Sequence, residues 1–284
     1  MGQRHGRAPS SRSRAAQNRA SFHEACLLPS ACCAAAAWAF LEIAPGVAVC
    51  SPELVLVQLA ETLPMGELIA LGYEFCGCYP LEANRSGALV RAQLTTPARL
   101  SAFVNRVERM KGLRKARIAV QFVCAKSASA KEAEMDALLM TPMRWGGLGL
   151  PPALANEPVA LSEEAARIAR GDRVVCDLLW PQARVAAEYD GLAFHGGRHQ
   201  QARDSRRRDA LIADGFDVVT VTSSQIDSVS EFIEIADALS RKTRGRTPVR
   251  PVLFLDRHLQ LRHELRAFHH QHFPPVSPSE EDDA

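Results

Sequence analysis

The sequence predicts an α+β fold in which a mixed central sheet flanked by helices follows a mainly helical region. Two patterns support this prediction. Between residues 49 and 126, apolar stretches of helical length follow typical helix starts. After Pro152 the apolar runs become short and rich in valine and alanine, as strands are, with helical stretches between and after them. A chain of 284 residues is long enough for one large domain or two small ones.

The composition limits the classes of function. Apolar residues make up 47% of the chain, enough for a sizeable core, and the formal net charge is only +2. A nucleic-acid site would therefore be a local basic patch and not a field over the whole molecule. The eight cysteines lack the spacing of a zinc site and mostly lie in apolar surroundings. Cysteines in such surroundings usually serve as small core residues with free thiols. Because free thiols persist in a reducing compartment, we expect a cytoplasmic protein.

Residues 1–48 are expected to be disordered or poorly defined. The first twenty residues carry five arginines and no acid, a composition that cannot build a core. The apolar run from Ala31 to Leu41 is too short to span a bilayer, and we expect no membrane association. We interpret this run as an isolated buried segment or the result of a start codon placed too early. A signal peptide or a membrane tether is the alternative.

Residues 49–126 form the predicted helical region. Ser51-Pro52-Glu53 and Thr96-Pro97 are typical helix starts, and further helices are expected after Pro64 and from Leu113. The last two helices of the region carry only one acid, Glu108, beside a basic set. The basic set comprises Arg99, Arg106, Arg109, Lys111, Arg114, Lys115 and Arg117. Such a set indicates either a phosphate-facing surface or a solvated helix face.

Residues 127–245 are predicted to contain the sheet. Ser129 and Glu132 fit a capping box at the start of one helix. Strands are then expected at 158–161, 173–179, 184–189 and 216–222, with a helix at 207–214 before the last strand and another at 226–240 after it. Residues 246–284 follow as a basic linker, a helix over 256–270 and an acidic, proline-rich tail.

Three acids stand out in the second and third predicted strands. Asp177 lies among apolar residues, and Glu188 and Asp190 are two positions apart, so they share a sheet face. A tight turn at Pro181-Gln182 makes the two strands antiparallel neighbours. Buried acids are costly unless they are paired or bind a cation, and oxygen ligands suit a divalent metal. The alternative is that the aspartates are turn or cap residues and that Glu188 lies on a solvated face.

Other polar residues could support such a site. His195 follows Asp190-Gly191 after a short loop and could relay a proton, contact a metal-bound water or cap the loop. Asp204 is a natural helix cap, and Arg207 or Arg208 could clamp a phosphate, or simply lie on a solvated helix start. Glu132 could supply a further acid, in competition with its capping role.

These segments together resemble a known group. The motifs SASAKE, GLGLPPALAN, DLLWP, EYDGLAFH and DSRRRDALIADGF, with VCSPEL upstream, are similar to the very-short-patch-repair-like endonuclease domain of unassigned function. That group belongs to the restriction-endonuclease-like PD-(D/E)xK superfamily, and its relatives include the C-terminal domains of abortive-infection antitoxin proteins. The resemblance covers about residues 127–242, and each motif is weak alone, whereas five in the right order are fairly specific.

The resemblance implies a restriction-endonuclease-like core and roles for individual residues. Asp177 and Glu188 match the superfamily's metal-binding acids, and Glu132 matches the acid of the first helix. His195 matches the histidine after the Asp-Gly pair, while Asp204 and Arg207 match the acid–arginine pair before the next helix. Asp190 stands where many members of the superfamily have lysine, a residue thought to orient or activate the attacking water.

The leading hypothesis is therefore a cytoplasmic DNA endonuclease that depends on Mg²⁺ or Mn²⁺. Asp177, Glu188 and Asp190 would hold the metal, Glu132 and His195 would support it or the water, and Arg207 and Arg208 would hold phosphate. The alternative is a DNA-binding regulator or antitoxin-like protein, with a toxin or other protein as partner, that keeps the fold without turnover. The missing lysine and the basic helices motivate this alternative.

Overall fold

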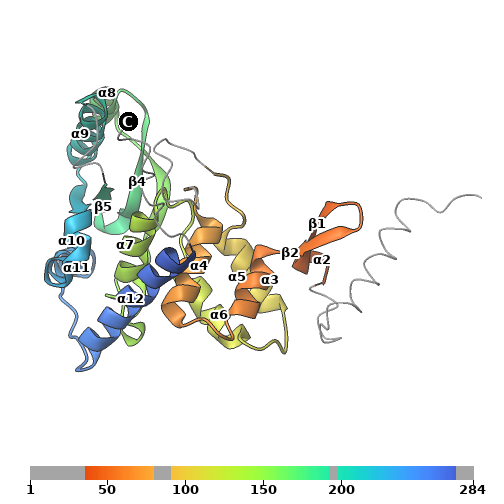
Figure 1. Cartoon of the computed structure of the whole chain (residues 1–284). Coiled ribbons are helices and arrows are strands. Elements are labelled where there is room, and N and C mark those ends of the chain that lie inside the picture. Colours follow the sequence, from red (N-terminus) through yellow and green to blue (C-terminus); the bar gives the residue numbers. More distant parts are fainter. Residues whose placement is uncertain (1–35, 80–90, 192–197, 273–284) are drawn as a thin grey trace, which may run out of the picture.

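The computed structural model describes residues 36–79, 91–191 and 198–272, and these combine helices with one mixed sheet, which confirms the α+β class (Figure 1). A short helix and a hairpin come first, followed by four helices. Their bounds are α2 Ala36–Ala39, β1 Phe40–Ala44, β2 Val47–Cys50, α3 Pro52–Leu59, α4 Met65–Cys76, α5 Pro97–Arg106 and α6 Leu113–Ala119, with a 3-10 turn at Val120–Phe122.

The predicted helix starts in this first part are confirmed. Ser51 Oγ accepts a hydrogen bond from Leu54 N at 3.2 Å, and Thr96 Oγ1 accepts one from Arg99 N at 3.2 Å. A proline follows each cap, where a missing N–H costs nothing. Local capping chemistry therefore fixes where α3 and α5 begin.

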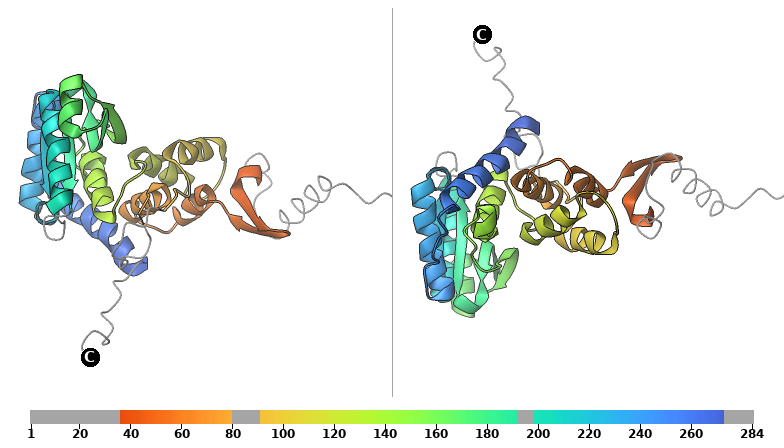
Figure 2. Two further views of the ribbon diagram at one scale, coloured as in Figure 1. Left: turned by 90° about the horizontal axis from the view of Figure 1, so that it is seen from above. Right: turned by 90° about the horizontal axis from the view of Figure 1, so that it is seen from below.

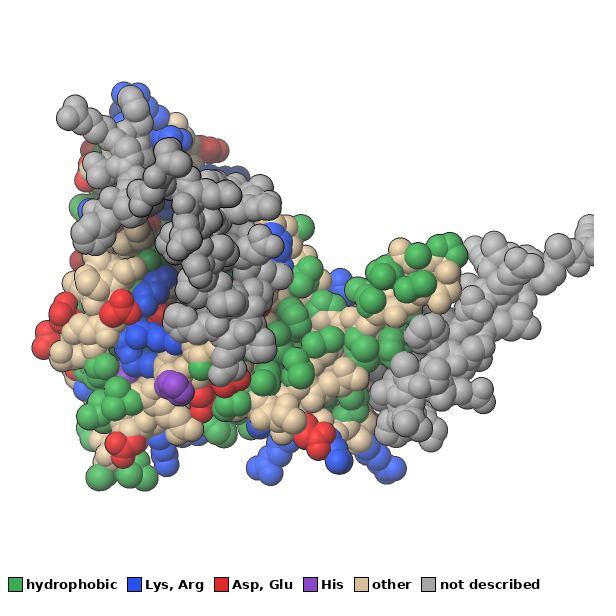
Figure 3. Space-filling model, in the orientation of Figure 1, with side chains coloured by type: hydrophobic (Ala, Val, Ile, Leu, Met, Phe, Trp, Pro, Cys, Tyr) green, Lys and Arg blue, Asp and Glu red, His purple; other side chains and the backbone are tan. Residues whose placement is uncertain are grey.

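The hairpin formed by β1 and β2 was not predicted from the sequence. Strands β1 and β2 are antiparallel and project from the helices (Figures 1 and 2). Leu41 lies opposite Val49, and these two are exposed together with Ile43 and Val47. Hydrophobic side chains accordingly gather on the hairpin in Figure 3. Within the segment 1–48, the described residues 36–48 form α2 and most of this hairpin, in which alternating apolar residues pair across a turn.

Much of the basic set on α5 and α6 contacts the protein itself. Arg99 Nε lies 3.2 Å from Glu53 Oε1, and Lys115 Nζ donates to Leu63 O at 2.7 Å. Arg117 donates to the carbonyl of Val104 at 2.8 Å. These contacts neutralise Arg99 and anchor Lys115 and Arg117 to the protein.

The second part holds the sheet. Its elements are α7 Ala130–Met140, a 3-10 turn at Met143–Trp145, β3 Leu154–Ala160, α8 Glu163–Ala169, β4 Arg173–Trp180, β5 Val185–Asp190, α9 Arg198–Ala213, β6 Asp217–Thr222, α10 Ser223–Asp227, α11 Val229–Arg244 and α12 Phe254–His272. The strand order is β3-β4-β5-β6; the first two pairings are antiparallel and β5 runs parallel to β6. The four predicted strands are present, joined between β4 and β5 by a turn at Pro181–Ala183.

Helices cover both faces of this sheet (Figure 2). On one face, Leu178, Ala187 and Val221 join the large hydrophobic core that also contains the buried residues of α7 and α11. On the other, Leu179 and Ala186, which pair with each other, pack with Leu211 of α9 in a smaller cluster. Helix α8, which the sequence analysis missed, packs beside α9 and is capped by Ser162. The sheet is therefore the middle layer of three.

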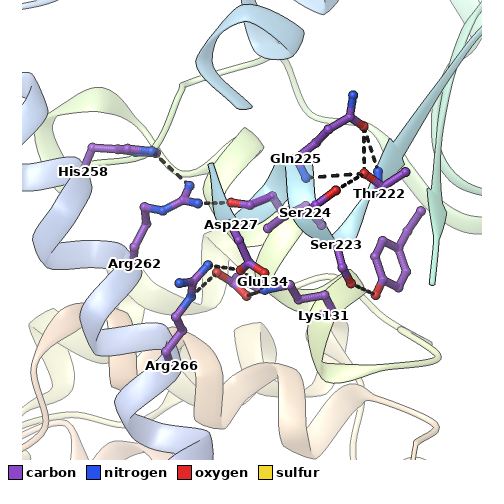
Figure 4. A network of polar contacts seen from close by, with 12 residues as sticks. Lys131, Glu134, Thr222, Ser223, Ser224, Gln225, Asp227, His258, Arg262 and Arg266 are labelled. Atoms are coloured by element: carbon purple, nitrogen blue, oxygen red, sulfur yellow. Dashed lines mark hydrogen bonds and ion pairs between the residues drawn. The ribbon is translucent and has the colours of Figure 1, made fainter. Parts of the chain in front are cut away.

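Helix α12 joins the helical region to the sheet region. It packs against α4 and α7, and its buried Leu261, Leu265 and Phe268 belong to the large core. Arg266 bonds Glu134 of α7 and Asp227 of α10, both at 2.7 Å (Figure 4). One core therefore runs from residue 39 to residue 268. No helix in the three described ranges is both long and apolar enough to cross a membrane.

A buried histidine lies beside this network. His258 has no exposed surface, and its Nδ1 lies 2.7 Å from Gly146 O while its Nε2 lies 3.4 Å from Arg262 Nη1 (Figure 4). A neutral ring satisfies both contacts, with Nδ1–H donating to the carbonyl and Nε2 accepting from the guanidinium. A second ring proton would instead face a cation.

Protonation of His258 is expected to destabilise the fold in mild acid. Burial lowers the pKa of the imidazole from 6.5 to about 4, with Arg262 and Arg250 adding to the effect and the Gly146 carbonyl opposing it. The unfolded chain binds the proton first, so the free energy of unfolding falls as the pH drops from 6.5 through 4. The loss between pH 7 and pH 5 is about 2 kcal/mol. Urea unfolding of the wild type and of His258→Gln at both pH values measures this loss. The variant should lose less unfolding free energy than the wild type by this amount, and equal losses would contradict the assignment.

Candidate functional site

The strand register places four polar residues in one row across the sheet. Leu178 pairs with Ala187, so the next position along brings Asp177 opposite Glu188. Glu188 in turn pairs with Thr220 of β6, and the β3–β4 register places Asn156 opposite Asp177. Side chains directly opposite in neighbouring strands share a face. The sheet thus carries its polar row where β4 and β5 meet.

A pocket of about 760 Å³ opens over this row and brings most of the predicted site residues together. It is lined from four directions: by the start of α7, by β4, by β5 with the following residues, and by α9. The predicted residues on its lining are Glu132, Asp177, Glu188, Asp190, Asp204, Arg207 and Arg208. His195 lies outside the described residues, so its predicted role has no structural counterpart here.

Asp177 is fixed by the neighbouring strand. Its Oδ2 accepts a hydrogen bond from Tyr189 N at 2.7 Å. Burial raises the pKa of this carboxyl, whereas the Tyr189 hydrogen bond and the cation of Arg207 lower it. The side chain is therefore held in one orientation by the backbone, with a charge that its surroundings only partly stabilise.

Glu132 combines the two roles that the sequence left open. Its backbone N–H donates to Ser129 Oγ at 3.1 Å, and its Oε2 accepts from Ala128 N at 3.0 Å, which caps α7. Its Oε1 accepts from Asn156 Nδ2 at 2.7 Å across the pocket. Asn156 has φ of 52°, a left-handed conformation that an asparagine tolerates better than most residues. Burial, and then the charge of Asp177, raise the pKa of Glu132 to about 7.

Glu188 faces an arginine from the opposite layer. Arg207 Nη2 lies 3.6 Å from Glu188 Oε1, beyond hydrogen-bond distance, and the same guanidinium contacts Val175 O at 2.5 Å and Asp204 Oδ1 at 3.4 Å. Glu188 Oε1 is buried and accepts no hydrogen bond from the described residues. Burial raises the pKa of Glu188 and Arg207 opposes that shift. One carboxylate oxygen at the pocket therefore has unused capacity to bind a donor or a cation.

Asp136 is a buried acid near the site that the sequence analysis missed. It lies one turn after Glu132 on α7, is fully buried, and neither carboxyl oxygen has a hydrogen-bond partner among the described residues. Burial, followed by the charges of Glu132 and Asp177, raises its pKa well above the usual range. The sequence carries no local signal for this burial, because Lys131 and Glu134 on the same helix are also charged and only the packing of α7 separates these residues.

The pocket does not contain a ready-made metal cage. Within the three described ranges, no group of three or more histidine, cysteine, aspartate or glutamate side chains is arranged to hold a metal ion. Asp177, Glu188 and Asp190 line the same pocket, but they do not converge as the three ligands that the sequence analysis expected. What the pocket offers is a buried carboxylate pair on adjacent strands, with arginines beside it.

Comparison of the chain with protein-family models, with curated proteins and with solved structures found no match. The interpretation of this pocket therefore rests on its geometry and chemistry.

The coupling between Glu132 and Asp177 gives a direct test of the site's electrostatics. Asp177→Asn removes one negative charge, so the pKa of Glu132 should fall from about 7 toward its ordinary 4.5. Carbon-13 NMR titration of the Glu132 carboxyl measures this shift. Asp204→Asn is the matched control, because Asp204 affects Asp177 and Glu188 but is not a cause of the Glu132 shift. An unchanged pKa in Asp177→Asn would show that the two carboxyls do not interact.

Proposed function

We propose that this protein is a DNA endonuclease that depends on Mg²⁺ or Mn²⁺ and whose sheet region is a restriction-endonuclease-like core. The observation that carries the proposal is the pocket at the β4–β5 junction, where Asp177 and Glu188 each lie one position beyond the Leu178–Ala187 pair and share the lining with Arg207 and Arg208 of α9. Burial raises the pKa of both acids, and the charge of Asp177 raises that of Glu188 further, a pattern typical of functional sites. The resemblance in motifs points to the same chemistry.

The residues present suit a magnesium ion that keeps part of its water shell better than a metal ion enclosed entirely by protein ligands. Mg²⁺ keeps several waters and is commonly bound by one or two carboxylates together with substrate phosphate. Asp177 and Glu188 would hold it, because Glu188 Oε1 accepts no hydrogen bond among the described residues and both carboxyls have raised pKa values that a cation would lower. When bound, such an ion polarises a phosphate oxygen and lowers the pKa of a bound water. Asp190, on the same pocket wall, would assist through that water shell.

The protein's own groups would orient the DNA strand. Arg207 and Arg208 line the pocket, and a guanidinium binds phosphate oxygens through two parallel N–H donors. Arg207 also places a positive charge beside Glu188, next to the position where Asp190 replaces the usual lysine. Glu132 would hold Asn156 in place and support the metal or its water, and His195 would relay a proton. Among the described residues, Cys76, Cys78, Cys124 and Cys176 form no disulfide, which favours a reducing cytoplasm.

Cleavage should require the carboxylate pair. Purified protein is expected to nick or cut plasmid DNA with Mg²⁺ or Mn²⁺ but not with a chelator, and Asp177→Asn or Glu188→Gln should reduce the rate by roughly 100-fold or more. Mn²⁺ binding followed by electron paramagnetic resonance should weaken in the same variants. Asp217→Asn, an exposed acid paired with Lys242 at 2.7 Å, is the control. Full cleavage by both pocket variants would refute the proposal.

A second function has a specific observation in its favour. Asp190 cannot supply the positive charge of the usual lysine, and the described residues hold no three-ligand metal group. A DNA-binding regulator or antitoxin-like protein that has lost turnover, and that acts with a toxin or other protein partner, would have these features. It would bind DNA in the presence of a chelator and cleave none, whatever the metal.

Arg207 should contribute to DNA binding under either function. Removing one phosphate contact weakens binding uniformly across sequences and reduces the slope of log affinity against log salt by about one. Arg207→Ala is expected to show both effects in fluorescence anisotropy with a labelled duplex. Arg173→Ala, an exposed arginine at the start of β4, should show neither. A salt slope identical to that of the wild type would exclude Arg207 from the interface.

A further inference from the structure

A second hollow lies at the other end of α7 from the carboxylate pocket. Two adjoining depressions, of about 610 and 490 Å³, share Met65, Lys115 and Trp145, and we treat them as one groove. The start of α4, the loop before α6, the 3-10 turn after α7 and the outer side of α12 provide its walls. Glu132 lies in the first turn of α7, whereas Trp145 follows its last, so the two sites are separate.

The floor of the groove is apolar. Met65, Met110, Leu113 and Ile118 line it together with the ring of Trp145 and Leu261. Methionine side chains adapt their shape to different apolar partners, which is why they are frequent on surfaces that bind peptide segments. An apolar floor of this kind would suit a segment that inserts several aliphatic or aromatic side chains.

The rim of the groove is cationic. Arg114 lines one depression, and Arg144 and Arg257 line the other. Their guanidinium groups make no hydrogen bond or ion pair with any described residue, whereas the two acids on the lining are occupied. Glu61 pairs with Lys111 at 3.2 Å, and Glu264 accepts from Gly66 N at 2.7 Å. Three positive charges without a partner among the described residues, around an apolar floor, would complement a ligand that is apolar along one side and acidic at its edges.

We propose that this groove docks a segment of another protein that combines large apolar side chains with several aspartate or glutamate residues. Two adjoining depressions that combine an apolar floor with a cationic rim suit a chain segment carrying both kinds of side chain, in the manner of an amphipathic helix laid in a groove. Complementary charge sets the partner and its orientation, while the apolar side chains supply affinity. Nucleic acid fits less well, because its phosphates would satisfy the rim but leave the methionine and leucine floor without apolar partners.

Selection from a random library of displayed 16-residue peptides, with the full-length protein as target, tests the proposal whatever the identity of the partner. Recovered peptides should be enriched in both acidic and large apolar residues. A selected peptide, labelled for fluorescence anisotropy, should bind Arg114→Glu/Arg144→Glu at least tenfold more weakly. Both arginines are exposed, so the variant should fold, which circular dichroism verifies. Arg173→Glu, distant in the fold, should bind as the wild type does.

Three outcomes would overturn the proposal. The first is a failed selection, in which no peptides are enriched, the enriched peptides lack acidic residues, or they bind the double variant with the same affinity as the wild type. The second is displacement of the peptide by a 20-nucleotide oligo-dT that itself binds more tightly, which would make the groove a nucleic-acid surface. The third is a tenfold gain in peptide affinity for a chain ending at His272. That gain would assign the groove to the acidic residues at positions 280–283, which lie outside the described residues.

Discussion

The constraint on which the site depends is the burial of four carboxyl groups within one region of the fold. Glu132 and Asp136 lie on α7, and Asp177 and Glu188 lie on adjacent strands of the sheet. Burial is the first cause of the raised pKa of every one of them. A core built only for stability would place apolar residues at such positions, because each unpaired buried charge costs several kcal/mol. Such a cost is expected where a site is built to act on a ligand.

The surrounding structure offsets part of this cost with donors from several elements. Tyr189 N serves Asp177, Ala128 N and Asn156 serve Glu132, and Arg207 faces Glu188. Each donor is itself held by regular structure: a strand pairing, a helix start or a helix on the far face of the sheet. The pocket is therefore built into the rigid layers, and its geometry does not depend on a long loop for the acids that line it.

Local sequence patterns were sufficient for the parts of the fold that local chemistry controls. Ser51, Thr96 and Ser129 mark helix starts through side-chain caps, and the alternation in residues 173–190 with a turn at Pro181 predicted that the strands of Asp177 and Glu188 are antiparallel neighbours. The left-handed conformation of Asn156 and the burial of Asp136 were not predictable in this way, since both depend on how α7 packs on the sheet. Helix α8 was not predicted because it is only seven residues long and Ala165 is its only buried residue.

Helix α7 connects the two sites physically, and its packing decides how they could influence each other. Its carbonyls at Leu138 and Leu139 accept from Leu148 N and Leu150 N at 2.8 and 2.9 Å, which ties the segment after Trp145 to the helix. Glu134 is bonded to Arg266 on α12, and Glu132 to Asn156. Any axial shift of α7 would break several of these contacts together within a closely packed core. Regulation by movement of α7 would therefore cost the free energy of several contacts at once. An occupant of the groove would instead leave the carboxylate geometry unchanged and act by bringing the pocket to a partner.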